Sequence, residues 1–190
     1  MKIIDDVIPE VMQNQLHEIC IQPDFAWTFL EDATYDRSEM LIKKMDKPKY
    51  PSFSHLAMKD YRPRGPVAGM ISSHLLCMSD KAGLDPGIVY RVRFGMYLAI
   101  KDSPLHHNMH VDMKCPHTVC LYYVNDCDGD TFFFDNNRQI VDRITPKKGR
   151  MVVFDGLTLH ASSAPSKNYR ITMNTVYAYP QQTTQPNTPI

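Results

Sequence analysis

The sequence predicts one mainly β domain with flanking helices, folded as an antiparallel β-sandwich or jelly roll in its C-terminal half. After Gly87, six short runs of β-branched and aromatic residues alternate with turn sequences such as DCDGD and DNNR, and no helical segment separates them. Strands that follow one another in this way pair in antiparallel sheets. Helical periodicity is confined to the N-terminal half, and 190 residues are enough for one sizeable core.

Residues 1–30 predict a strand, a helix and a second strand. KIIDDVIP is typical of a short strand and turn, and Val11, Leu16 and Ile19 then recur near helical spacing. Pro9 is suited to the first turn of that helix. The run FAWTFL is rich in aromatic residues and is predicted to be a strand.

A long polar segment, rich in proline, precedes the second helix. A loop as long as residues 31–65 is usually functional in a compact domain, for example as a lid. Helical spacing returns at Val67 and Leu75 and stops at Gly83, a residue that favours the end of a helix. Residues 1–86 are therefore predicted to supply helices and loops, with the helices packed on one sheet.

The predicted β core covers residues 87–180, and the single domain covers residues 1–180. The sequence that follows, QQTTQPNTPI, is polar and contains two prolines, so residues 181–190 are expected to be a disordered tail. The predicted strands of the core are IVYRVRFGMYLAI, HTVCLYYVN, DTFFFD, QIVDRIT, RMVVFDG and RITMNTVYAY.

Charge and cysteine content exclude several kinds of partner and environment. Lys plus Arg and Asp plus Glu number 21 each, so no overall charge draws the chain to nucleic acid or anionic lipid. The five cysteines form an odd set without a CxxC pair, and the N-terminus has no apolar signal core. We therefore expect a reduced protein of the cytoplasm with no nucleic-acid or membrane partner. The oligomeric state stays open.

The stretch LHHNMHVDM brings three histidines and an aspartate together. His110 and Asp112 are two residues apart, so in an extended chain both side chains leave the same face. His160 follows the predicted strand and turn GRMVVFDGLTL and is placed to supply a third ligand. Two histidines and one carboxylate leave positions open on a metal, which suits non-haem Fe(II), although zinc or manganese also accept these ligands. His106 and His107 are interpreted as surface or substrate-entrance residues.

Arg170 follows His160 by ten residues and opens the last predicted strand. A cavity that holds a metal and an inward arginine requires an anion. A dicarboxylate that bridges the two satisfies both, because a guanidinium binds a carboxylate through two parallel hydrogen bonds. Tyr123 and Tyr97, on neighbouring predicted strands, could donate phenolic hydrogen bonds to the same acid.

The segments HVD, TVCLYYVN, GDTFFF, PKKGRMVVFDGLTLH and YRITMNTVY resemble, in order and spacing, a known family. They look like the double-stranded β-helix core (a cupin-like jelly roll) of the Fe(II)/2-oxoglutarate-dependent dioxygenases. Within that superfamily the chain is most similar to the prolyl 4-hydroxylase branch and to small bacterial and phage oxygenases of that type. The resemblance covers residues 90–179, with a weaker match at IIDDVIP and FAWTFL. A phage-encoded member would work in the cytoplasm of its host.

The resemblance implies a set of site residues. The implied iron ligands are His110, Asp112 and His160. The implied contacts with 2-oxoglutarate are Arg170, Tyr123, Tyr97 and Asn174. Arg170 would pair with the C5 carboxylate of 2-oxoglutarate, and Tyr123 matches a tyrosine that touches the same group in relatives. The chain departs from the pattern at two points: the loop between Tyr97 and His110 is longer than in many relatives, and Asn174 replaces another residue common in prolyl hydroxylases.

The activity that the resemblance implies is hydroxylation of a C–H bond, with a prolyl residue in a peptide or protein as the nearest substrate class. It would require Fe(II), 2-oxoglutarate and O2, release succinate and CO2, and accept ascorbate as a reductant. Residues 35–64 and 101–109 would frame the substrate entrance. Hydroxylation of a free amino acid or small metabolite is the alternative, because the same fold and cofactors serve many substrates.

Three rival functions differ in specific residues or in turnover. A halogenase of this superfamily replaces the triad carboxylate with a small residue, and Asp112 argues against that function. A nucleic-acid demethylase of the AlkB type usually has a second arginine six residues after the first, where this chain has Val176. A cupin-like metal-binding protein without turnover is a rival of a different class, and release of succinate would exclude it.

Overall fold

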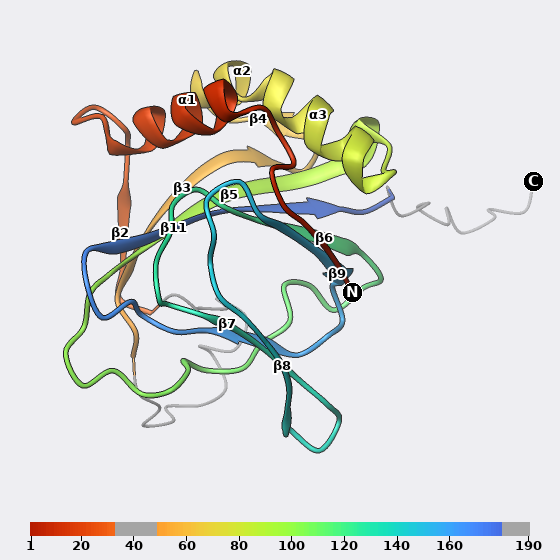
Figure 1. Cartoon of the computed structure of the whole chain (residues 1–190). Helices are drawn as coiled ribbons and strands as arrows, with labels where there is room; N and C mark the ends of the chain where they lie inside the picture. The colour runs from red at the N-terminus through yellow and green to blue at the C-terminus, as the bar shows by residue number, and fades with distance from the viewer. Residues whose placement is uncertain (33–48, 180–190) are drawn as a thin grey trace, which may run out of the picture.

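Two antiparallel sheets face each other in the computed structural model, which describes residues 1–32 and 49–179 (Figure 1). The strands of the large sheet, in spatial order, are β1 (Lys2–Ile4), β9 (Met151–Asp155), β6 (Thr118–Tyr123), β11 (Tyr169–Tyr177), β5 (Val89–Leu98), β3 (Ser52–Lys59) and β2 (Thr28–Leu30), with β4 (Arg62–Pro63) paired to β3. The small sheet contains β10 (His160–Ser162), β7 (Thr131–Phe134) and β8 (Ile140–Ile144), in that order. The arrangement confirms the predicted mainly β jelly roll with flanking helices.

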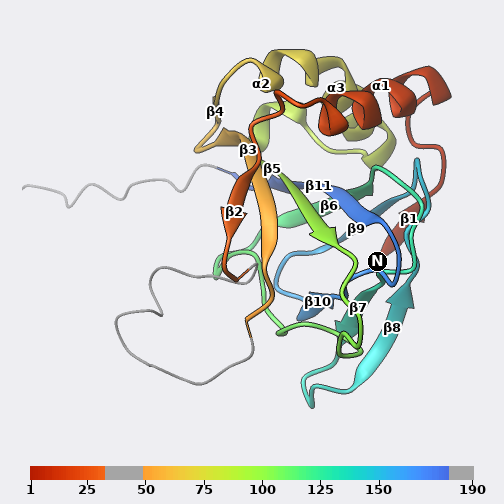
Figure 2. The same cartoon turned by 90° about the vertical axis from the view of Figure 1, so that its left-hand side faces the viewer.

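The helices cover the face of the large sheet that lies away from the small sheet (Figures 1 and 2). They are α1 (Glu10–Ile21), α2 (Val67–Met70), α3 (Ser72–Ala82) and the 3-10 turn η1 (Pro86–Ile88). Leu16 of α1 and Leu75 of α3 share a core with Phe94 and Met173 of the sheet. Burying these side chains contributes roughly 1.5–3 kcal/mol each, which is the main force that holds the helices in place.

The central strands β5 and β11 separate an apolar face from a polar one, because successive side chains of a strand point to opposite faces. Val92 and Phe94 of β5 belong to the core under the helices, as do Ile171 and Met173 of β11. The alternate positions line a pocket between the two sheets and are mostly polar: Arg93, Gly95, Tyr97, Arg170, Thr172 and Asn174. The strand period thus supplies both the core and the candidate site.

The segment predicted to be a long loop contains a strand, and that prediction was wrong for its second half. Residues 52–59 form β3, which pairs with β5 from Phe53 opposite Met96 to Lys59 opposite Arg91. The local sequence carries weak strand signals, and the pairing with a distant strand decides the structure. Residues 33–48 of the predicted entrance loop lie outside the described residues.

Two smaller differences concern element ends. The second predicted helix is divided at Ile71 into α2 and α3, and it ends at Gly83 in the left-handed conformation, as expected. The three-residue strand β10 was not predicted, because so short a run has no periodicity of its own. The predicted tail after residue 180 lies outside the described residues. No helix among residues 1–32 and 49–179 is long and apolar enough to span a membrane.

Candidate metal centre

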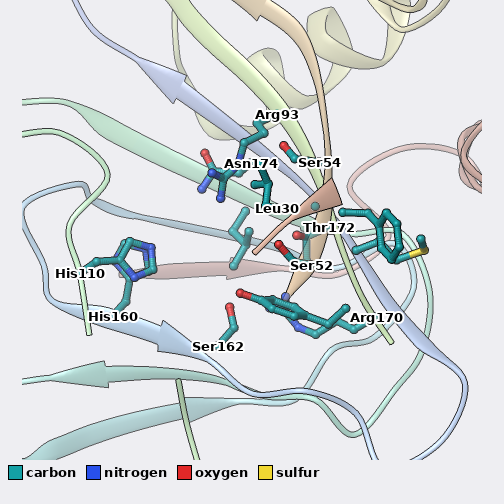
Figure 3. Close-up of a pocket in the computed structure, with 15 residues that line it drawn as sticks. Leu30, Ser52, Ser54, Arg93, His110, His160, Ser162, Arg170, Thr172 and Asn174 are labelled. Atoms are coloured by element: carbon teal, nitrogen blue, oxygen red, sulfur yellow. The ribbon is translucent and has the colours of Figure 1, made fainter. Parts of the chain in front are cut away.

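Three side chains predicted as metal ligands converge between the sheets. One ligand atom from each of His110, Asp112 and His160 lies within 4.8 Å of the others. Backbone pairing brings the two histidines together across fifty residues of chain: the N–H of each donates to the carbonyl of the other, at 3.0 Å in both directions. Figure 3 shows the two imidazoles next to each other at one end of the pocket. The predicted ligand set is therefore assembled in space.

Each triad histidine is oriented by a hydrogen bond from its Nδ1 to a backbone carbonyl. Nδ1 of His160 donates to the carbonyl of Thr158 at 2.9 Å, and Nδ1 of His110 donates to the carbonyl of Asn108 at 3.3 Å. These bonds fix the orientation of each ring, and they place Nε2 of His160 3.8 Å from an Asp112 carboxylate oxygen. Burial, with a contribution from His160, lowers the pKa of His110 to about 4, so its imidazole is neutral at physiological pH.

Asp112 is held as a carboxylate by two neighbours. Its side chain is 4% exposed, and it accepts from Arg91 Nη2 at 2.5 Å and from Asn174 Nδ2 at 3.0 Å. Burial alone would raise the pKa of this carboxyl, but the positive charge of Arg91, with a smaller contribution from Arg93, outweighs it and keeps the pKa well below the usual range. The ionised Asp112 carboxylate and the neutral His110 imidazole are in the protonation states that a divalent metal requires of its ligands.

Arg91 is a site residue that sequence reasoning missed. The available signal was the pair of arginines two residues apart in the strand sequence YRVRFG, which places Arg91 and Arg93 on the same face of a half-buried strand. Asn174 was predicted to contact the co-substrate. The structure shows it bonded to Asp112 and lining the pocket, and its contact with a co-substrate stays a prediction.

Arg170 lies at the other end of the pocket and is 2% exposed (Figure 3). Its Nε donates to the carbonyl of Gly129 at 2.7 Å, and its Nη2 donates to the hydroxyl of Thr131 at 2.9 Å. The guanidinium lies 5.7 Å from the ring centre of Tyr123, whose hydroxyl donates to Thr131 at 2.8 Å. No ion pair joins it to a carboxylate of the described residues, so its positive charge is available to an anion.

Tyr97 stands opposite Arg170 in the pairing of β5 with β11 and lines the pocket. Burial raises the pKa of both Tyr97 and Tyr123, so both phenols stay protonated and can donate hydrogen bonds at physiological pH. Both tyrosines thus lie near Arg170. Contact of either with 2-oxoglutarate stays a prediction.

His107 was expected to lie at the surface or substrate entrance and is buried instead. It is 2% exposed, its ring stacks on Tyr50 at 4.2 Å between centres, and it meets the edge of Tyr97 at 4.7 Å. Half-buried His106 packs edge-on against Phe134. Neither belongs to the metal-ligand group, in agreement with the sequence interpretation. The surface prediction failed for His107 because two aromatic rings, Tyr50 before β3 and Tyr97 of β5, pack against it.

The chemistry of this donor set fits the metal that the sequence suggested. Two imidazoles and one carboxylate on one side of a site suit Fe(II) with open positions, and Nδ1 of each imidazole is already bonded to a backbone carbonyl. A buried arginine at the far end of the same polar pocket fits an acid such as 2-oxoglutarate. The described residues thus provide for both groups.

No protein-family model and no curated protein sequence matches this chain. Solved structures do match. A 2OG-Fe(II) oxygenase family oxidoreductase from Burkholderia pseudomallei has a TM-score of 0.64 and 12% identity, over 90% of this chain and 81% of that one. A Pseudomonas putida prolyl-4-hydroxylase has a TM-score of 0.55 and 11% identity, over 94% of this chain and 92% of that one.

A third match is a prolyl hydroxylase from Trichoplax adhaerens, in complex with a hypoxia inducible factor peptide fragment. Its TM-score is 0.61 and its identity 15%, over 93% of this chain and 82% of that one. At these identities the likeness shows a shared fold. The resemblance stated from the sequence motifs is confirmed in that sense: the chain has the fold of 2-oxoglutarate and Fe(II) oxygenases, prolyl hydroxylases among them.

Proposed function

We propose that this protein is an Fe(II)- and 2-oxoglutarate-dependent oxygenase that hydroxylates a C–H bond. The observation that carries the proposal is one pocket with two ends. His110 and His160 of the ligand group line one end, and Arg170, without a carboxylate partner among the described residues, lines the other. A metal alone would explain the first end and leave the buried guanidinium unexplained. A metal together with a dicarboxylate explains both.

The residues of the pocket have distinct tasks in this proposal. His110, Asp112 and His160 would hold Fe(II), and Arg170 would hold the far carboxylate of 2-oxoglutarate. Arg91 and Asn174 orient the Asp112 carboxylate through the bonds described above. Bound iron would supply O2 activation coupled to oxidation of 2-oxoglutarate, which yields succinate, CO2 and the hydroxylated product.

A prolyl residue in a peptide is the substrate that we propose within this chemistry. Support comes from the fold shared with the Pseudomonas putida prolyl-4-hydroxylase and with the Trichoplax adhaerens enzyme that carries a peptide. Hydroxylation of a free amino acid is the second candidate, and a further cation in the pocket, Arg93, favours it because it could bind the carboxylate of an amino acid. In either case the protein would be an enzyme of the 2-oxoglutarate-dependent oxygenases.

Substitution Asp112→Ala tests the proposal. We expect wild-type protein with Fe(II), 2-oxoglutarate and ascorbate to release succinate, and we expect Asp112→Ala to lose that release by at least about a hundredfold, because the metal loses its carboxylate ligand. The measurement is succinate by mass spectrometry, alongside a screen of proline-containing peptides and free amino acids for a gain of one oxygen.

Asp24→Ala is the matched control, since Asp24 is exposed and outside the pocket. The control should keep wild-type succinate release. Metal binding without succinate release from any substrate would instead favour a binding protein of the same fold. Full activity in Asp112→Ala would contradict the assigned metal centre.

A further inference from the structure

Arg93 is a second positive charge in the pocket and has no counter-ion of its own. It lines the same pocket as His110 and His160, and its Nε is buried without a hydrogen-bond partner. No hydrogen bond or ion pair links its side chain to any residue in the described ranges 1–32 and 49–179. Arg93 is half-buried, and a guanidinium whose Nε is buried without such a bond costs free energy, which makes it a candidate to bind a ligand that enters the pocket.

The neighbouring carboxylate does not fill this role. Asp112 is the described carboxylate whose charge acts on Arg93, and both of its oxygens already accept hydrogen bonds, one from Arg91 and one from Asn174. Arg91 therefore neutralises Asp112, and the charge of Arg93 is left over. Burial and the nearby Arg91 lower the pKa of Arg93, yet a guanidinium starts from so high a pKa that it stays protonated.

Arg93 is also separate from the carboxylate position at Arg170. In the pairing of β5 with β11, Tyr97 stands opposite Arg170 and Arg93 stands opposite Asn174. The two arginines are thus four residues apart along the strands, on the same face, which corresponds to about 13 Å of backbone. Figure 3 shows them at different parts of the pocket, with Arg93 beside Asn174 and Ser54. A dicarboxylate that reaches the metal from Arg170 leaves Arg93 for another ligand.

Small residues give that ligand room between the two arginines. Gly95 lies between Arg93 and Tyr97 on the pocket face, and a methyl group added there would meet only the Thr172 hydroxyl, at 3.7 Å. Ser54 of β3, opposite Gly95, lines the pocket from the next strand. The small side chains beside Arg93 therefore leave space lined by polar groups, as a site for a small charged group requires.

We propose that Arg93 binds a carboxylate of the substrate and so restricts this enzyme to acidic substrates. The inference rests on the proposed function, because it takes the Arg170 end of the pocket as the 2-oxoglutarate position. The carboxylate can belong to a free amino acid or to an acidic side chain or C-terminus of a peptide. The recognition chemistry is the same in both cases: an anion paired with a guanidinium that already lies beside the metal ligands.

The experiment measures thermal stability of protein loaded with Mn(II) and 2-oxoglutarate, so that no turnover occurs. Added propionate should stabilise the loaded wild-type protein, because a ligand of the native state raises its stability, whereas isosteric propionamide should not. Loss of a charge-assisted pair weakens binding by about ten- to a hundredfold, so Arg93→Met should need that much more propionate for the same effect. Arg93→Lys should recover part of it.

Two further pairs of probes distinguish the sources of the carboxylate. L-proline against L-prolinamide tests a free amino acid, and a prolyl-aspartyl peptide against its prolyl-asparaginyl analogue, both with amidated C-termini, tests an acidic side chain. The acidic member of one pair should stabilise the loaded protein at lower concentration than its amide, and Arg93→Met should abolish that difference. Arg64→Met is the matched control, since Arg64 is exposed and outside the pocket.

Three results would overturn the inference. Propionate and propionamide could act alike on wild-type protein, Arg93→Met could leave the response to propionate unchanged, or it could weaken 2-oxoglutarate binding as strongly as propionate binding. The last result would assign Arg93 to the co-substrate. Failure of the proposed function looks different, because wild-type protein would then gain no stability from Mn(II) and 2-oxoglutarate together.

Discussion

At the scale of single residues, three arginines on one sheet face, Arg170 buried and Arg91 and Arg93 half-buried, are distinguished by their contacts. Arg91 neutralises the Asp112 carboxylate, and Arg170 is fixed by the Gly129 carbonyl and the Thr131 hydroxyl. Arg93 has neither kind of partner among the described residues. A guanidinium that is bonded only to neutral groups keeps its full charge for a ligand. The position and hydrogen bonds of each arginine therefore decide which acid it can bind.

Arg170→Ala should raise the 2-oxoglutarate concentration needed for half-saturation by about ten- to a hundredfold, because one charge-assisted pair is lost. Metal affinity should change little, since Arg170 lies at the opposite end of the pocket from the triad. Titration of 2-oxoglutarate into the Fe(II) protein, followed by the metal-to-ligand charge-transfer band, measures the first quantity. Arg170→Lys should recover only part of the affinity. An unchanged midpoint in Arg170→Ala would remove the assignment of 2-oxoglutarate to this end.

At the scale of elements, the turn between β6 and β7 holds the guanidinium of β11. Gly129 is in that turn, and its carbonyl accepts from Arg170. A Cβ at this position would lie 2.9 Å from the backbone nitrogen of Pro165, 2.9 Å from the Ser163 carbonyl oxygen and 3.0 Å from Arg170 Cδ. Glycine is thus required there because three segments meet too closely for any side chain.

Gly129→Ala should therefore lower the free energy of unfolding by about 1–3 kcal/mol, the usual effect of overpacking, and weaken 2-oxoglutarate binding because Arg170 must move. Chemical denaturation and the titration described for Arg170 measure the two effects. Gly69→Ala is the matched control: Gly69 is helical, has nothing within 4 Å of the added carbon, and should be neutral or slightly stabilised. Wild-type stability in Gly129→Ala would show that the turn adjusts without cost.

At the scale of the whole molecule, buried neutral histidines tie stability to pH. Burial is the main cause that lowers the pKa of His74, of His107 and of His110, to about 4 for the last two. Between pH 6.5 and 4 the unfolded chain binds more protons than the folded one. Acid therefore favours unfolding, so this stability is fully present above pH 6.5 and is lost as the pH falls toward 4.

His107→Phe isolates one of these contributions, because the aromatic stack with Tyr50 can persist without a titrating group. We expect the free energy of unfolding of wild-type protein to fall more steeply between pH 6 and 4.5, by up to about 1.4 kcal/mol per pH unit, than that of His107→Phe. Urea denaturation of the metal-free proteins at several pH values provides the comparison. If the free energy of unfolding of both proteins fell equally with pH, His107 would bind its proton equally well in the folded and the unfolded chain.

Sequence by itself determined the parts of this protein that depend on local periodicity and spacing. Alternation in RVRFGMY and RITMNTVY predicts strands with one polar face, and the two-residue spacing of His110 and Asp112 predicts ligands on one side of the chain. The order of these motifs also predicted the jelly roll, His160 as the third ligand and Arg170 as a pocket residue. The strand faces and the His110–Asp112 pair follow from residues close together in the chain, whereas the jelly roll, His160 and Arg170 followed from the order and spacing of motifs along it.

Only the tertiary structure decided what depends on contacts between distant strands. The pairing of β3 with β5 turned part of a predicted loop into a wall of the pocket, and the backbone bridge between His110 and His160 assembled the triad. Burial of His107 likewise depends on Tyr50, far away in sequence. The ion pair with Asp112, which Arg91 forms and Arg93 does not, also joins distant parts of the chain. Such contacts are set by strand register and packing, because the free energy of a non-local pair depends on every element that brings it together.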